Sequence, residues 1–308
     1  MMRPVRPLLP EGGHDGGEAG EAPSRAEILR AVLASHYNQP ATALWRTVEL
    51  EAVLRHVHFA GRMLDLGCGD GSLGALVIPA TCTIFGVDLS LEDLKLAART
   101  GRYTKVVASD AGALPFPDAS FDMVFSNSVL EHIPHLDKVL RDISRVLRAG
   151  GELAFTVPSD QFMLLLRRPA QLRAIGRPEQ AEAYVRELNA RVQHYHYLSP
   201  AEWRDRLAAV GMQVVQAAYY LDRATLHAWE RWHNRSAGVA RRLTRAHLST
   251  REIQRRFHLI GAHPVGLQRL LAGVFERLLL PAVKRDSGGG ASGACLLVRA
   301  VKMRMDEG

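Results

Sequence analysis

Residues 63–74 constrain the fold more than any other stretch, because a short apolar run there is followed at once by a glycine-rich loop. Met63, Leu64 and Leu66 are typical of a buried parallel strand, and the four glycines that follow let the backbone approach a ligand closely. The spacing from Gly69 onward is G-x-G-x-x-G, which is a weak signal by itself. Together, the strand and the loop predict a ligand site at the carboxyl end of a strand in a parallel sheet.

Three aspartates at the ends of successive predicted strands indicate what the ligand carries. Asp65 stands two residues before the first glycine, where its carboxylate would repel a pyrophosphate and hold an ammonium group. Asp88 can accept both ribose hydroxyls of an adenosine ligand, and Asp110 can accept the adenine amino group. Each of the last two could instead be an ordinary turn or strand-end residue. Their joint spacing with the glycine loop favours an adenosine ligand that carries an ammonium group.

The order of predicted elements indicates an α/β fold. Short apolar strands alternate with helices, which predicts a doubly wound, mostly parallel, Rossmann-like seven-stranded sheet with an antiparallel edge strand. The two last strands are expected to pair antiparallel at one edge of the sheet. The strands are predicted over residues 62–66, 83–87, 103–108, 121–126, 152–157, 212–221 and 294–303.

The rest of the chain divides by composition. Residues 1–23 are rich in Gly, Glu and Pro and are expected to be a disordered tail. Capping residues predict helix starts at Ser24 and Ser199. The predicted organisation is one domain over 24–221 and 287–308, a helical lid insertion at 159–198 and a helical insertion at 222–286.

The basic residues are concentrated in the segment 222–286. It contains 13 Lys and Arg and 5 Asp and Glu, whereas the rest of the chain contains 26 basic and 27 acidic residues. Basic helices with Trp229, Trp232 and a leucine stripe from Leu267 to Leu278 could contact an anionic membrane surface or an acidic substrate. They could instead form a cap on the sheet with solvated arginines, which is the interpretation we favour. We expect no nucleic-acid partner, because aromatic residues do not interleave with this basic run.

Cysteine usage and hydropathy bear on the compartment. Three cysteines lie far apart and form no C-x-x-C pair, which is typical of reduced thiols in a cytosolic protein. No apolar run approaches the roughly 20 residues of a membrane span, and no apolar segment follows the first arginines as in a signal peptide. We therefore expect a cytoplasmic protein, with peripheral contact at the inner membrane surface through 222–286 left open. The oligomeric state does not follow from the sequence.

The motifs now described resemble those of a known family. Leu64-Asp-Leu-Gly-Cys-Gly-Asp-Gly71, Gly86-Val-Asp-Leu-Ser90 and Asp110-Ala111 look like the successive motifs of class I S-adenosylmethionine-dependent methyltransferases. The resemblance continues through residues 114–132 and 145–151, and it is greatest to the branch with ubiquinone-, menaquinone- and natural-product-type enzymes. It covers about residues 60–160. One departure is Ala149, where the family commonly has the proline of a Pro-Gly-Gly turn.

The resemblance implies S-adenosyl-L-methionine as cofactor and gives roles to individual residues. Asn127 would lie beneath the sulfonium, and Leu89 would pack on the adenine. Independently, Arg46 could fold over the cofactor and pair with its carboxylate, or it could be a solvated arginine. The implied cofactor-binding residues are Asp65, Gly67, Cys68 and Gly69 for the methionine part, Asp88 for the ribose, and Leu89, Asp110 and Ala111 for the adenine.

Methyl transfer is an in-line displacement at carbon, to which an enzyme contributes positioning and desolvation rather than a nucleophile of its own. A hydroxyl acceptor would gain from a general base. His132 is the candidate for that base, or else a structural histidine that caps the next helix. His194 and His196 are candidates for lining the substrate site or for structural roles. We expect no metal site, because no third ligand stands at a suitable spacing from these two histidines.

The predicted function is that of an enzyme, a methyltransferase acting on O, N or C of a small molecule, which could be lipid-linked or a natural product. Two alternatives remain open. One is a catalytically silent protein that binds the cofactor and serves as a scaffold. The other is a nicotinamide-dependent reductase, which the position of Asp65 disfavours.

Overall fold

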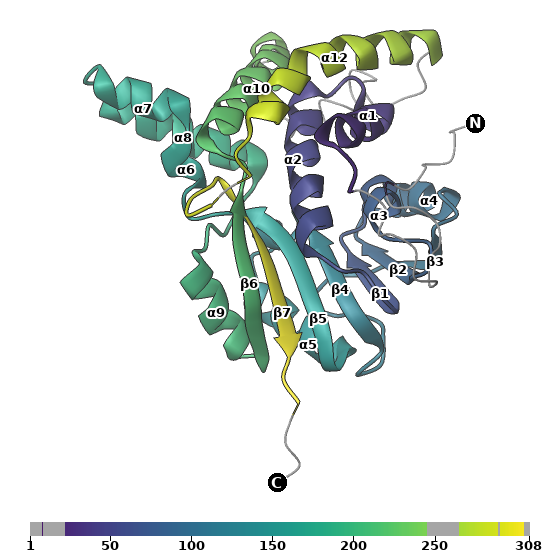
Figure 1. The fold of residues 1–308 in the computed structure, drawn as a ribbon. Helices are drawn as coiled ribbons and strands as arrows, with labels where there is room; N and C mark the ends of the chain where they lie inside the picture. Colours follow the sequence, from purple (N-terminus) through teal and green to yellow (C-terminus); the bar gives the residue numbers. More distant parts are fainter. Residues whose placement is uncertain (1–7, 9–21, 245–264, 289, 305–308) are drawn as a thin grey trace.

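The structure is a computed structural model that describes residues 8, 22–244, 265–288 and 290–304 (Figure 1). The predicted tail falls outside the described residues except for residues 8, 22 and 23, and so does the segment 245–264 of the basic insertion. None of the helices within these described ranges is long and apolar enough to cross a membrane.

Seven strands form one sheet in the order β3-β2-β1-β4-β5-β7-β6, as the sequence predicts for a Rossmann-like fold. The first five strands are mutually parallel along the sheet. The chain runs outward from β1 to β3 and then returns to place β4 on the other side of β1. This reversal makes the β1–β4 boundary the point where parallel α/β sheets bind ligands. The strands are β1 (Arg62–Leu66), β2 (Thr83–Asp88), β3 (Tyr103–Ala108), β4 (Phe121–Asn127), β5 (Leu147–Pro158), β6 (Met212–Tyr220) and β7 (Cys295–Lys302).

The antiparallel part of the sheet is built by the last strand. β7 pairs antiparallel with both β5 and β6, which confirms the predicted pairing of the two final strands. β7 therefore lies one position inside the edge, and β6 is the edge strand. β5 begins at Leu147, earlier than the predicted residue 152, because Leu147 already pairs with Phe121 across an irregular register. Gly150 and Gly151 thus lie within the strand rather than after the preceding helix.

Helices cover both faces of the sheet over two separate hydrophobic clusters. One cluster joins residues of α1, α2, α10 and α12 to the sheet, and the other joins residues of α5 and α9 to its opposite face. Figure 1 shows α1, α10 and α12 grouped around α2, with α7 and α8 projecting beside α10. The α-helices are α1 (Arg25–His36), α2 (Pro40–His56), α3 (Ser72–Val77), α4 (Leu91–Arg99), α5 (Leu136–Val146), α6 (Phe162–Leu165), α7 (Arg167–Ala174), α8 (Pro178–Val192), α9 (Pro200–Ala208), α10 (Arg223–Thr244) and α12 (Val265–Arg285).

The capping signals of the sequence are confirmed. The Ser24 side chain and Glu27 form a reciprocal capping box at α1, and Ser199 and Glu202 form another at α9. Each box satisfies amide groups that the first turn of a helix leaves without an intrahelical partner. These caps fix where the two helices begin.

The described parts of the basic insertion pack on the N-terminal helices. The Arg25 guanidinium of α1 donates to the carbonyls of Val283 at 2.9 Å and Asp286 at 2.6 Å, at the end of α12. The same guanidinium pairs with Glu51 of α2 at 2.8 Å. α12 also contacts α10. The end of the insertion is therefore held on the pair α1–α2, which in turn covers the ligand end of the sheet.

Candidate active site

The glycine loop after β1 has the backbone conformation that the sequence predicts. Gly67, Gly69 and Gly71 all have positive φ angles, of 75°, 54° and 75°. The amides of Gly67 and Cys68 both donate to the Val87 carbonyl of β2, at 2.7 and 3.0 Å. A Cβ on Gly67 would come within 2.4 Å of Val129, in the segment after β4. Glycine is therefore required at this position both for its backbone angle and for space.

Asp88 is integrated into this loop. Its carboxylate accepts the Gly69 amide at 2.9 Å and the Ser90 amide at 2.8 Å. A Cβ on Gly69 would meet nothing within 4 Å, so the loop faces open space beside this carboxylate. Leu89 next to it is 75% exposed, although it is a large apolar side chain. An apolar ring lying on Leu89 would cover it, as the predicted adenine contact requires.

Asp110 follows at the next strand end. Its carboxylate accepts the amide of Gly112 at 2.7 Å, so it forms part of a turn, and the residue is otherwise exposed. Ala111 beside it is half-buried. Because β1, β2 and β3 are adjacent and parallel, the glycine loop, Asp88 and Asp110 line one edge of the sheet. That arrangement has room for an extended ligand laid across the strand ends, and the ribose and adenine contacts stay predictions.

Asp65 lies below the loop rather than on its open side. It is 3% exposed, and the Tyr103 hydroxyl donates to its Oδ2 at 2.6 Å. Burial raises the pKa of this carboxyl to about 6, against the lowering effect of the Tyr103 hydrogen bond. A Cβ on Gly74 would be 2.4 Å from Oδ2, so α3 begins directly on top of it. Its contact with the ammonium group stays a prediction. In the structure, Asp65 packs beneath the glycine loop and the start of α3.

Cys68 has a half-buried side chain within the same loop. Burial, with the negative charges of Asp65 and Asp88 beside it, raises the pKa of its thiol. The thiol is therefore protonated at neutral pH and supplies packing rather than a nucleophile.

A buried polar network occupies the switch point beyond β4. Glu49 of α2 is fully buried and forms an ion pair with Arg46 on the same helix. Its Oε1 accepts hydrogen bonds from the hydroxyl groups of Ser128 at 2.6 Å, Thr156 at 2.9 Å and Tyr220 at 3.1 Å. Burial alone would raise the pKa of Glu49, but the Arg46 guanidinium and the hydroxyl donors outweigh burial and lower it. Glu49 is therefore an ionised anchor between α2 and the ends of three strands.

Arg46 is neither solvated nor fully enclosed. Its side chain is 22% exposed, and its Nη1 donates to Ser128 at 3.1 Å as well as to Glu49. Burial would lower the pKa of the guanidinium, but the Glu49 charge raises it. A cofactor carboxylate would pair with guanidinium N–H groups of Arg46 that do not bond Glu49. This role of Arg46 stays a prediction.

Asn127 belongs to the same network. With its amide nitrogen toward Glu49, it donates to Glu49 Oε1 at 3.1 Å and to Thr156 Oγ1 at 2.7 Å. Its oxygen then accepts from Arg46 Nη1 at 3.2 Å. The backbone turns sharply at the next residue, since Ser128 has a φ of 54°. Asn127 is thus rigidly held at the end of β4, where the sequence predicts a residue beneath the sulfonium.

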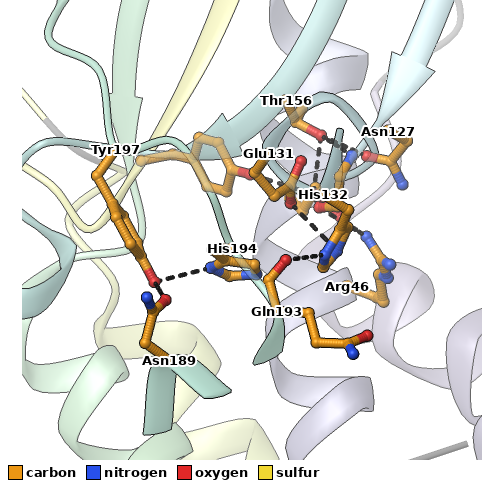
Figure 2. A network of polar contacts seen from close by, with 12 residues as sticks. Arg46, Asn127, Glu131, His132, Thr156, Asn189, Gln193, His194 and Tyr197 are labelled. Atoms are coloured by element: carbon orange, nitrogen blue, oxygen red, sulfur yellow. Dashed lines mark hydrogen bonds and ion pairs between the residues drawn. The ribbon is translucent and has the colours of Figure 1, made fainter. Parts of the chain in front are cut away.

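The segment after Asn127 brings Glu131 and His132 toward residues that follow α8 (Figure 2). His132 Nδ1 lies 3.1 Å from the Gln193 carbonyl, and His132 Nε2 lies 3.9 Å from Glu131 Oε1. The rings of His132 and His194 are in edge contact, with centroids 4.9 Å apart. The N-cap of α5 is His135, so the helix-capping alternative for His132 does not apply.

Glu131 and His194 are both strongly perturbed by burial. Burial raises the pKa of Glu131 to about 8 and, together with the nearby His132, lowers the pKa of His194 to about 3. His194 Nδ1 lies 3.1 Å from the Tyr197 hydroxyl, which in turn donates to Asn189 at 2.9 Å. Perturbed titratable groups that cluster at a strand end are typical of functional sites.

The two histidines of the pair His194 and His196 have different surroundings. His196 Nε2 lies 2.8 Å from the Ile133 carbonyl, so this ring ties the segment after α8 to the segment after β4. His194 alone joins His132 and Glu131. Proximity in sequence therefore does not make these two residues one site.

Several residues of this site were not predicted from the sequence. Glu49 carried the clearest overlooked signal, because it is an acidic residue between Val48 and Leu50 on a helix that is buried on several sides. The others gave no local signal, because their partners come from distant segments. They are Ser128, Glu131, Thr156, Asn189, Gln193, Tyr197 and Tyr220.

Comparison with known proteins finds similarity over the part of the chain that carries the motifs. Residues 64–155 match the family model described as "Methyltransferase domain". The chain is 36% identical over 124 residues to a malonyl-acyl-carrier protein O-methyltransferase of Enterobacter lignolyticus, which covers 40% of this chain and 49% of that protein. It is 28% identical over 205 residues to the protein of the same name from Methylococcus capsulatus, which covers 59% of this chain and 74% of that protein.

The chain therefore spans about half the length of the Enterobacter relative. Among solved structures, it is similar in fold to the cyclase SpnF, with a TM-score of 0.51 and 16% identity over 92% of this chain and 98% of that chain. This likeness concerns the fold alone. The family match and the ordered motifs at the strand ends agree: residues 64–155 are similar to a methyltransferase domain, and S-adenosylmethionine is the cofactor that this similarity implies.

Proposed function

We propose that this chain transfers a methyl group from S-adenosylmethionine to an oxygen atom of a small-molecule acceptor. The observation that carries the proposal is the Asp88 carboxylate, which the amides of Gly69 and Ser90 hold at the open side of the glycine loop. The loop and this carboxylate form a cradle for the ribose and the methionine part of the cofactor. When bound, the cofactor supplies an electrophilic methyl carbon on a sulfonium.

The chain's own contribution is to orient both reactants. Asp88 would accept the ribose hydroxyls, and Leu89 and Asp110 would contact the adenine, which directs the methionine part toward the β1–β4 boundary. Asn127, fixed by Glu49 and Thr156, would then lie beside the reacting centre. Such rigid positioning is the main source of catalysis in an in-line displacement.

The acceptor side is formed by α2, the turn after β4 and the segment after α8. Glu131, His132 and His194 lie together on this side, and they are the titratable groups that could take a proton from an acceptor hydroxyl. The printed names of the two relatives describe transfer to oxygen, which supports an oxygen acceptor here. Nitrogen and carbon acceptors are the other outcomes of a product analysis.

Binding measurements test the cofactor assignment. Isothermal titration of the full chain with S-adenosylmethionine and S-adenosylhomocysteine is expected to give one site, which Asp88→Ala should weaken strongly. Absence of binding to the wild type would refute the proposal. Incubation with methyl-labelled cofactor and a cell extract, followed by identification of the labelled product, would then give the acceptor.

Two other functions make different predictions in the same assays. A catalytically silent scaffold would bind the cofactor but label no product. A nicotinamide-dependent reductase would instead change NAD(P)H fluorescence on binding. The buried Asp65 beneath the loop opposes that alternative, because a pyrophosphate would lie close to its negative charge.

We further propose that α12 contacts an anionic membrane surface. Leu267, Leu270, Val274 and Leu278 recur at helical spacing and are 42–63% exposed. Arg269 and Arg277 on the same helix are exposed as well. Apolar side chains beside basic ones match a surface with anionic headgroups and an apolar interior.

A further inference from the structure

We propose that Glu131, His132 and His194 bind one divalent transition-metal ion, of which Zn²⁺ is the best match. Two imidazoles and one carboxylate are a donor set that proteins use for catalytic zinc, with a further position left for water or substrate. The three residues come from the segment after β4 and the segment after α8, which the fold brings together (Figure 2). The sequence alone shows no such site, because it offers His194 no nearby third ligand.

The donor atoms already lie close to one another. One ligand atom from each residue can be chosen so that all three are within 4.8 Å of one another, and His132 Nε2 is 3.9 Å from Glu131 Oε1. Bonds of about 2.0–2.2 Å to a tetrahedral zinc would bring the donors to about 3.4 Å apart. The donor atoms would therefore have to approach one another by up to about 1.4 Å on binding the ion.

The recorded hydrogen bonds of both histidines engage Nδ1, so Nε2 is the nitrogen that we assign to the proposed ion. The Gln193 carbonyl can only accept, so His132 carries its proton on Nδ1 and has the lone pair on Nε2. The Tyr197 hydroxyl gives its proton to Asn189, so it accepts from His194 Nδ1. Metal-binding histidines typically donate their second ring nitrogen to such an outer partner, which fixes the tautomer.

Glu131 supplies the negative charge that a cation requires. The residue is 1% exposed, and its Oε2 accepts no hydrogen bond from any described residue. A buried carboxylate oxygen without a partner is costly unless a proton or a cation compensates it. The Arg46 guanidinium, whose charge acts on Glu131, is already paired with Glu49. His132 Nε2, 3.9 Å from Glu131 Oε1, and a ring nitrogen of His194 lie close enough to this carboxylate to share one ion with it.

The arrangement leaves one side of the ion accessible. The His132 side chain is 43% exposed, whereas Glu131 is buried. An acceptor oxygen could therefore reach the ion from the exposed side, where coordination would lower the pKa of its O–H group. This role in activating the acceptor rests on the proposed function. The binding of the metal does not.

Equilibrium dialysis of the full chain against Zn²⁺, followed by elemental analysis, tests the site. We expect about one zinc per chain for the wild type, and affinity at least about 100-fold lower for Glu131→Gln and His194→Ala. Cobalt in place of zinc should give visible absorption bands that both variants lose. His196→Ala is the matched control, because His196 bonds the Ile133 carbonyl and not the proposed ion.

A second pair of variants guards against misfolding. His132→Ala changes a partly exposed side chain and should keep the fold, as circular dichroism will show, while losing zinc. Tyr197→Phe removes the acceptor for His194 Nδ1 together with the hydrogen bond to Asn189, and it should weaken zinc binding by about 10–100-fold. Titration with S-adenosylhomocysteine separates the two proposals, since these variants should still bind it.

Failure to retain stoichiometric zinc, or equal zinc affinity in wild type and Glu131→Gln, would overturn the metal site and leave the cofactor assignment intact. In that case a proton on Glu131 accounts for its unpartnered oxygen.

Discussion

The amide of Gly69 and the carboxylate of Asp88 join the ends of β1 and β2 through a 2.9 Å hydrogen bond. The carboxylate that we propose binds the ribose and the loop that we propose faces the methionine part are therefore positioned as one unit. A change at either residue should disturb both halves of the cofactor site, because each holds the other in place.

Asp88→Ala should weaken S-adenosylhomocysteine binding by at least about 10–100-fold, the loss expected for hydrogen bonds to a charged group. Isothermal titration measures the effect. Asp118→Ala provides the control, because its side chain is 78% exposed and lies before β4, away from the loop. Equal affinities of the two variants would show that Asp88 does not contact the ligand.

Gly67→Ala should abolish cofactor binding and destabilise the fold, because a Cβ would overlap Val129 at 2.4 Å. Gly101→Ala is a matched control with a similar φ of 70° and no atom within 4 Å of its Cβ. The control should lower the free energy of unfolding by only about 1–2 kcal/mol, which is the cost of a left-handed backbone for a residue with a Cβ. Urea unfolding distinguishes the two, and comparable losses would contradict the predicted close approach of the loop to Val129.

Asp65 should make the protein less stable as the pH rises from about 4 to about 6. Its pKa in the folded state is about 6 and its ordinary value is 3.8, so the folded state binds more protons in this window. The free energy of unfolding therefore falls with rising pH, by up to about 3 kcal/mol. Asp65→Asn should remove this slope in urea unfolding and be more stable than wild type at pH 7. A variant that is less stable at pH 7 would contradict the prediction.

Glu49→Gln should destabilise the fold by about 3–5 kcal/mol, because Arg46 would be left without its buried counter-charge. The double variant Arg46→Met, Glu49→Met should lose less free energy of unfolding than the single variant, because it leaves no unpaired charge. Since the folded-state pKa of Glu49 is lowered, its ionic contribution is present above the ordinary value of 4.5 and is lost as the pH falls. Denaturation curves at pH 7 and pH 4 measure both effects.

Replacing Leu270 and Leu278 by Glu should abolish co-flotation with phosphatidylglycerol vesicles while leaving the fold intact, since the two side chains are 63% and 53% exposed. Leu164→Glu is the control, because Leu164 is 72% exposed on α6, outside the basic insertion. Flotation that is absent in the wild type, or unchanged in the double variant, would rule out the proposed membrane contact.

The local parts of this structure could be predicted from the sequence, because their signals lie within a few residues of one another. The strand and loop at Leu64–Gly71, the cap at Ser199 and the Asp88 turn depend on neighbouring amides and on apolar runs. Their spacing along the chain also carries the family resemblance. The sheet order then follows from the connections expected of such units.

The acceptor side could not be predicted in the same way. Glu49 meets Thr156 and Tyr220 only after α2 packs on the sheet, and His194 meets His132 only after the segment that follows α8 folds back. No periodicity relates these positions. They depend on helix packing and on two residues with left-handed backbone, Ser128 and Gln193, whose φ angles of 54° and 56° sequence patterns did not indicate.

The place of β7 between β5 and β6 has a consequence for biosynthesis. β5 and β6 each hydrogen-bond to β7 and not to each other, and residues 221–294 separate β6 from β7. During synthesis, the edges of β5 and β6 that pair with β7 therefore remain unpaired until β7 has been synthesised and inserts between them. Unpaired strand edges favour association with other chains. Nascent chains of this protein should therefore be clients of chaperones, and a ribosome stalled before residue 295 should present an aggregation-prone intermediate.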